Sequence, residues 1–263
     1  MDPEWLALAV AATQPRLLIE LYGDLAKPGV AQVGKALSTV LGLGNTILLP
    51  IQLLNERARI LVEANVERYR EKLARTPEND ICPVRPEVGV PVVEKLSYVS
   101  DPDLRELYTT LLAKASTYAT QSQAHPSFVN IINNLSPDEA QLVRQFLQEP
   151  VIPFVQPSWT DPKTGIFLRR GIHIALLPST RLAFKVNLPA YISNLEGLGL
   201  IDVEHDVYSG PEEVYVRLET ECEASRPRGY TQVACSRGTI EITHFGWLFM
   251  QCCIGEQPSE GSG

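Results

Sequence analysis

The chain has 263 residues, a formal net charge of −8 at pH 7 and a 44% share of hydrophobic residues. These values predict a soluble protein with a buried core, in one large or two modest domains. The acidic balance argues against tight binding to nucleic acid, because such binding depends on clustered lysine and arginine side chains that displace counterions from phosphates. The five cysteines include no C-x-x-C pair, so the sequence indicates neither a zinc site nor a disulfide framework.

The first 76 residues are expected to form a helical domain. Apolar residues recur at helical spacing from Trp5 to Leu25, with an interruption near Pro15. Glu56–Arg75 has the pattern of an amphipathic helix with charges of both signs on its solvent face. The amino-terminal apolar run follows acidic residues and no basic ones, so we expect no signal peptide.

Residues 36–55 contain no charged side chain and are long enough to cross a bilayer, which needs roughly 20 apolar residues. Glycine, asparagine, threonine, proline and glutamine interrupt this run, so we favour a packed helical hairpin within the amino-terminal domain. Insertion into a membrane on activation is the alternative. The apolar side chains on which either structure would depend are Leu41, Leu43, Ile47, Leu48, Leu49 and Leu53.

Residues 77–100 are expected to connect two domains. Pro77, Pro83, Pro86 and Pro91 lack an amide hydrogen and have a fixed φ angle, which argues against a regular helix before residue 91. The segment is therefore predicted to be an extended, proline-rich linker.

Residues 101–254 are expected to form a second domain, helical at first and winged-helix-like towards its end. Asp101 is a candidate N-cap for one helix. Ser136, Pro137 and Glu139 have the spacing of a capping box with proline in the first helical position, which predicts the start of another helix.

The winged-helix-like part is predicted from a series of short elements. A helix over Leu188–Leu198 should end at Gly199, where a left-handed backbone conformation would close it. Strands are predicted over Leu200–Val203 and Val214–Leu218, and an apolar helix over Thr243–Cys253 follows them.

The predicted fold class is therefore mainly α. An amino-terminal helical domain precedes a winged-helix-like α+β carboxy-terminal domain, and the small polar residues 255–263 are expected to form a flexible tail.

Several stretches of the chain resemble one bacterial family through their spacing and caps. They are KPGVAQVGKAL at Lys27–Leu37, the proline-rich strip Pro83–Pro91, LRELYTTLLAKAS at Leu104–Ser116, HPSFVNIINNLSPDEA at His125–Ala140 and YISNLEGLGLID at Tyr191–Asp202. In these stretches the chain resembles the abortive infection alpha family, which is linked to phage defence. The resemblance implies a role in antiphage defence and implies no particular reaction.

A candidate interaction surface lies in the carboxy-terminal half. It combines basic residues, interleaved phenylalanines and two polar residues of the following helix: Arg169, Arg170, Arg181, Lys185, Tyr191 and Asn194, with Phe167 and Phe184. Basic and aromatic side chains together suit contact with nucleic acid. The helix itself carries no lysine or arginine, so we favour docking of a protein.

The sequence contains no convincing catalytic pattern. Gly29–Ala36 matches G-x-x-x-x-G-K, but Ala36 occupies the position where a phosphate-binding loop needs serine or threonine. The four histidines are widely separated and no G-x-S-x-G motif occurs. We therefore expect no enzyme activity, no metal and no cofactor.

The expected function is antiphage defence through non-enzymatic binding of a protein partner or of a second copy of the chain. One alternative is a membrane-acting toxic effector that uses residues 36–55, and the other is a winged-helix regulator that binds nucleic acid. We expect a cytoplasmic protein that associates with a membrane only on activation.

Overall fold

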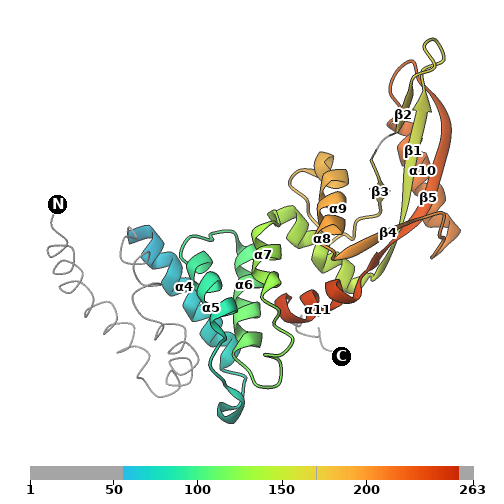
Figure 1. Ribbon diagram of the computed structural model, residues 1–263. Coiled ribbons are helices and arrows are strands. Elements are labelled where there is room, and N and C mark those ends of the chain that lie inside the picture. Colours follow the sequence, from blue (N-terminus) through green and yellow to red (C-terminus); the bar gives the residue numbers. More distant parts are fainter. Residues whose placement is uncertain (1–55, 170, 255–263) are drawn as a thin grey trace, which may run out of the picture. The chain divides into compact units, whose positions relative to one another are not determined.

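The computed structural model describes residues 56–169 and 171–254, which divide into two compact units (Figure 1). Of the described residues, unit 1 comprises 56–134 and 252–254, and unit 2 comprises those between 135 and 251. The predicted hairpin or membrane segment at residues 36–55 lies outside the described residues. None of the helices in the described residues combines the length and the apolar character that crossing a bilayer requires.

Unit 1 is built from helices around an apolar core. They are α4 (Glu56–Leu73), the short 3-10 helix η1 (Glu78–Asp80), α5 (Pro86–Leu96), α6 (Pro102–Ala115) and α7 (Ser127–Asn133). Leu73, Leu107 and Phe128 are buried. The predicted N-cap of α6 is confirmed, since the Asp101 carboxylate accepts hydrogen bonds from the N–H groups of Asp103 and Leu104 at 3.0 Å.

Helix α5 corrects the prediction of an extended linker. Pro86 begins the helix, where its missing N–H costs nothing, but Pro91 lies inside it. An interior proline costs about 3 kcal/mol, whereas burying a valine or leucine side chain contributes roughly 1.5–3 kcal/mol. Val88, Val92 and Leu96 are all buried on one face of α5, so their burial outweighs the cost of Pro91.

Unit 2 combines helices with an antiparallel sheet. Its elements are α8 (Pro137–Gln148), β1 (Val151–Thr160), β2 (Phe167–Arg169), β3 (His173–Ile174), η2 (Lys185–Asn187), α9 (Leu188–Gly197), β4 (Ile201–His205), α10 (Glu212–Ala224), β5 (Thr231–Ile242) and α11 (His244–Cys253), whose last residues belong to unit 1. The strand order is β2-β1-β5-β4, and β3 pairs with the same edge of β1 as β2.

The long pair of β1 and β5 makes the fold mixed α+β rather than mainly α (Figure 1). Strand β1 is difficult to predict from the sequence because it contains Pro153 and Pro157, and proline is rare in central strands. On one edge β1 pairs only at residues 154–155 and 158–160, which leaves both prolines opposite gaps in that ladder.

Helix α10 corrects the prediction of a strand over Val214–Leu218. The β-branched and aromatic residues there suit a strand locally. In the structure Tyr215, Leu218 and Cys222 lie at helical spacing, and all three are buried with Val155 of the sheet. Burial of this helical face therefore overrides local propensity.

Two predicted helix ends in unit 2 are confirmed. Gly199 has a φ of +72°. Its N–H donates to the carbonyl of Glu196, and the N–H of Leu200 donates to the carbonyl of Leu195, which together form a Schellman motif after α9. Ser136 and Glu139 form the expected capping box at the start of α8.

Candidate interaction surface

The segment leading into α9, residues 181–187, exposes apolar and basic side chains together. Phe184 is 64% exposed and Val186 is 85% exposed, although neither can hydrogen bond to water through its side chain. Arg181 and Lys185 are exposed as well. We call residues 181–187 the approach segment.

A buried carboxylate fixes the backbone of the approach segment. Asp138, in the first turn of α8, is only 6% exposed. Its Oδ1 accepts a hydrogen bond from the N–H of Ala183, and its Oδ2 accepts one from the N–H of Phe184, both at 2.8 Å. The Tyr191 hydroxyl donates to Oδ2 at 2.9 Å. The three hydrogen bonds join α8, the approach segment and α9.

The charge of Asp138 is stabilised by these donors. Burial alone would raise the pKa of Asp138, but the hydrogen bonds from Ala183, Phe184 and Tyr191 outweigh it and hold the pKa below its ordinary value. Asp138 is therefore ionised at neutral pH, and a charged acceptor gives stronger hydrogen bonds than a neutral one.

A second contact joins α8 to α9. The Nδ2 group of Asn194 donates to Oε1 of Glu139 at 2.7 Å, while the other carboxylate oxygen of Glu139 accepts from the N–H of Ser136. Tyr191 is 9% exposed. Of the predicted surface residues, Tyr191 thus shares Asp138 with the approach segment, and Asn194 joins α9 to α8.

The predicted basic cluster is divided between two places. Arg169 lies on β2 beside the exposed Phe167, at the end of the sheet away from α9 (Figure 1). Arg181 and Lys185 lie in the approach segment. Arg170 lies outside the described residues.

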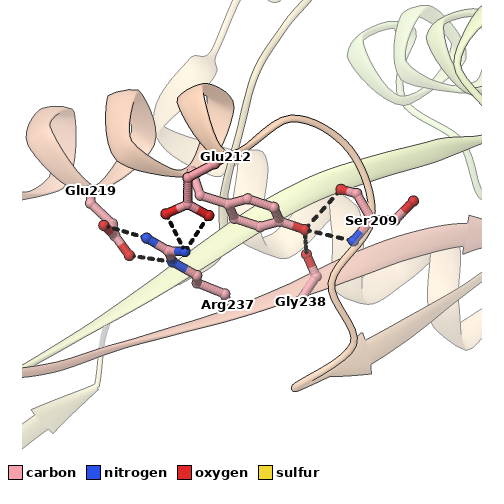
Figure 2. A network of polar contacts seen from close by, with 6 residues as sticks. Ser209, Glu212, Glu219, Arg237 and Gly238 are labelled. Atoms are coloured by element: carbon pink, nitrogen blue, oxygen red, sulfur yellow. Dashed lines mark hydrogen bonds and ion pairs between the residues drawn. The ribbon is translucent and has the colours of Figure 1, made fainter.

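A different arginine, which the sequence analysis missed, organises α10. The Arg237 guanidinium on β5 donates through Nε and Nη2 to Glu219 at 2.6 and 3.0 Å, and through Nη1 to both oxygens of Glu212 at 2.9 and 3.0 Å (Figure 2). It also lies 5.2 Å from the ring centre of Tyr215. The spacing of Glu212, Tyr215 and Glu219 would have indicated this cluster only if residues 212–224 had been predicted as a helix.

The Tyr215 hydroxyl extends this network to the sheet. The hydroxyl lies within donating distance of two carbonyl oxygens, those of Ser209 and Gly238, at 3.0 and 3.3 Å. It also accepts a hydrogen bond from the N–H of Ser209 at 3.2 Å. The whole network joins α10 to β5 and to the turn before α10 (Figure 2). These hydrogen bonds and ion pairs therefore stabilise the position of α10 on the sheet.

A family model described as abortive infection alpha matches residues 61–253. The chain belongs to the abortive infection alpha family. This confirms the resemblance seen in the sequence, although the stretch Lys27–Leu37 and residues 36–55 lie outside the matched region. Asp138, the approach segment and the Arg237 network all lie inside it.

Other comparisons add little to the family assignment. A solved structure of an uncharacterized protein from the hydrocarbon-degrading marine bacterium Alcanivorax borkumensis SK2 is similar at 14% sequence identity, with a TM-score of 0.30. That match covers 50% of this chain and 96% of the other. Comparison with curated proteins gives no match.

No three histidine, cysteine, aspartate or glutamate side chains within residues 56–169 and 171–254 come together as a metal site.

The sequence analysis did not reveal the buried position of Asp138 or the exposure of Val186. An acidic residue in the first turn of a helix is normally explained by the helix dipole, so the pattern around Asp138 carried no further signal.

Proposed function

We propose that the protein acts in antiphage defence by binding another protein through its approach segment, without catalysing a reaction. The family assignment supports the defence role. The observation that favours protein binding is the exposure of Phe184 and Val186 on a backbone that the buried Asp138 holds in place. We propose that the protein does this in the cytoplasm.

The proposed partner has an acidic surface around an apolar pocket. Arg181 and Lys185 flank Phe184 and are exposed, so they would meet carboxylates while Phe184 and Val186 enter the pocket. Aromatic side chains commonly dominate the binding energy of interfaces. Because the approach segment is already ordered, binding would lose little backbone entropy.

The proposal is tested with Phe184→Ser combined with Val186→Ser. Both side chains are exposed, so the double variant should melt like the wild type and yet fail to protect cells in a phage plaque assay. The matched control is Tyr98→Ser combined with Tyr118→Ser, which removes two exposed aromatic residues from unit 1, where they are 53% and 58% exposed. That control should protect normally.

A photo-crosslinking amino acid at position 184 tests contact directly. During infection it should form an adduct with another polypeptide, whereas the same amino acid at exposed Ala224 should not. An adduct with a second copy of the chain would identify self-association as the interaction. Full protection by the Phe184 and Val186 double variant, without an adduct at position 184, would contradict the proposal.

A nucleic-acid-binding role is the second candidate, since one topological observation favours it. In winged-helix modules the strand before the recognition helix pairs with the second strand of the wing. Here β1 precedes α9 and pairs with β5, and β5 also pairs with β4, which gives the order β1-β5-β4. In this interpretation α10 is an insertion in the wing.

The side chains weigh against this second role. Helix α9 contains Glu196 and no lysine or arginine, and the chain carries a net charge of −8. We expect duplex DNA to bind with a Kd of about 1 µM or weaker at physiological salt, which is within the usual range for non-specific binding. Nanomolar, sequence-dependent retention in a gel-shift assay would favour the regulator instead.

A further inference from the structure

Helix α10 and strand β5 carry two cysteines that meet beneath the helix. Cys222 is 1% exposed and lies on the buried face of α10. Cys235 of β5 is half-buried and packs against the cluster that contains Cys222, Leu218 and Val155. Neither cysteine is in a disulfide.

The strand register independently places the two cysteines on facing surfaces. In the ladder between β1 and β5, Arg237 lies opposite Val155 and Cys235 lies opposite Pro157. Side chains two residues apart on a strand point to the same face, so Cys235 points to the face from which Arg237 reaches Glu219. Cys222 follows Glu219 by one helical turn, which brings it over Cys235.

The two thiols belong to the same packed cluster and differ in character. Hydrogen bonding with the neighbouring Cys222 holds the pKa of the Cys235 thiol below its ordinary value. The same hydrogen bonding, together with burial, raises the pKa of Cys222. Cys235 is thus both the more accessible thiol and the more readily ionised one, which are the properties of a thiol that reacts with oxidants.

We propose that Cys222 and Cys235 form a reversible disulfide that fastens α10 to β5 when a peroxide reaches the protein. This modification site is separate from the approach segment and does not depend on the proposed function. The pair lies well apart in the sequence and includes no C-x-x-C motif, so the sequence alone does not reveal it.

The reaction balances with the peroxide as oxidant. The Cys235 thiolate attacks one peroxide oxygen, the oxygen–oxygen bond breaks, and a sulfenic acid and one water result. The Cys222 sulfur then attacks the sulfenic sulfur, which forms the sulfur–sulfur bond and releases the second water. Each thiol loses one hydrogen, and the peroxide gains the two electrons.

The disulfide would attach α10 covalently to β5 at a position that the Arg237 ion pairs do not reach. The Arg237 ion pairs hold the first turn and the middle of the helix, at Glu212 and Glu219. Cys222 lies in the last turn before Ala224. Oxidation should therefore raise the melting temperature of unit 2, and a thiol reductant should reverse the change.

Peptide mapping of the full-length protein tests the proposal. After treatment with hydrogen peroxide and alkylation of free thiols, trypsin should release Leu218–Arg228, because it does not cleave between Arg226 and Pro227, and Gly229–Arg237. Each peptide contains one of the two cysteines. We expect the two to be joined before reduction and separate after it.

Variants and melting curves complete the test. Cys235→Ser should abolish both the joined peptides and the oxidation-dependent rise in melting temperature. Cys82→Ala, which removes a buried cysteine of unit 1, should retain both. Separate alkylation of Cys222 and Cys235 after peroxide treatment would overturn the proposal, as would a disulfide that leaves the melting temperature unchanged. Mapping of the wild type decides the question even if a variant fails to fold.

Discussion

At the scale of single residues, Asp138 does more for unit 2 than its place in a helix cap suggests. Its two oxygens accept hydrogen bonds from Ala183, Phe184 and Tyr191. A buried carboxylate is tolerated only when such donors replace the water it has lost. The exposed approach segment therefore depends on a residue that is itself hidden.

Replacing Asp138 with asparagine should destabilise unit 2 by about 2 kcal/mol or more at pH 7, because an NH2 group takes the place of one accepting oxygen and faces a donor, and the negative charge is lost. The folded-state pKa of Asp138 is lowered, so its contribution to stability is present above the unfolded value of about 4 and is lost as the pH falls below it. Urea unfolding at several pH values should show the difference between wild type and variant shrinking in acid.

The control for Asp138 is Asp202→Asn on β4, where the side chain is exposed. Substitutions at such surface positions usually change stability by less than about 0.5 kcal/mol. Equal midpoints for wild type and Asp138→Asn at pH 7 would show that the buried hydrogen bonds contribute nothing to stability.

Gly199→Ala should destabilise unit 2 by about 1 kcal/mol, because a β-carbon is unfavourable at positive φ. The space around Gly199 is open, with the nearest atom 4.0 Å from the position of the new β-carbon, so backbone strain is the whole effect. Gly197→Ala, inside α9 and also without a close neighbour, should be neutral or stabilising by up to about 1 kcal/mol. Chemical denaturation of both variants measures the contrast, and similar midpoints would contradict the argument.

At the scale of elements, α10 shows how one arginine can position a helix on a sheet. Arg237 offers its planar guanidinium to two carboxylates that lie about two turns apart on α10, which fixes both the rotation of α10 and its position along β5 (Figure 2). The two pairs are not equivalent. The side chain of Glu219 is 29% exposed and that of Glu212 is 68% exposed.

Glu219→Gln should therefore destabilise unit 2 by about 1 kcal/mol, and Glu212→Gln by less than about 0.5 kcal/mol, because solvent screens the more exposed pair. Urea unfolding of the two variants provides the comparison. High salt should reduce both effects. A larger loss for Glu212→Gln would mean that exposure does not govern the strength of these pairs.

At the scale of the whole molecule, the chain leaves unit 1 after residue 134 and returns to it at Cys252. Cys252 and Cys253 are fully buried and Ile254 is 8% exposed. Burial in apolar surroundings also raises the pKa of Cys252 to about 11, so this thiol is unreactive. The end of α11 is therefore part of the core of unit 1.

Removal of residues 252–263 should destabilise unit 1 by roughly 3 kcal/mol, because it empties space filled by three buried side chains. Removal of residues 255–263 alone should leave the stability unchanged, and it serves as the control. Thermal melting of both shortened proteins checks this. Equal melting temperatures would indicate that unit 1 is complete without the end of α11.

The candidate surface was only partly predictable from the sequence, because the exposure of a side chain depends on segments that are distant in the chain. Arg181 and Lys185 stand out in the sequence because they are basic, and both are exposed in the structure. The sequence did not distinguish Tyr191, which is buried, from Val186, which is exposed. The Tyr191 hydroxyl binds Asp138, which lies 53 residues away in the chain, so a short stretch of sequence around Tyr191 does not contain this partner.

The sequence by itself determined the local features of this protein and its family. Asp101, Ser136 and Gly199 end or begin helices through hydrogen bonds to residues no more than a few positions away, so a short stretch of sequence contains all the partners. Tertiary structure decided that Val214–Leu218 lies in a helix, that Pro91 lies inside one and that β1 pairs with β5. Those outcomes depend on apolar faces and strand edges contributed by distant segments, whose burial outweighs local propensity.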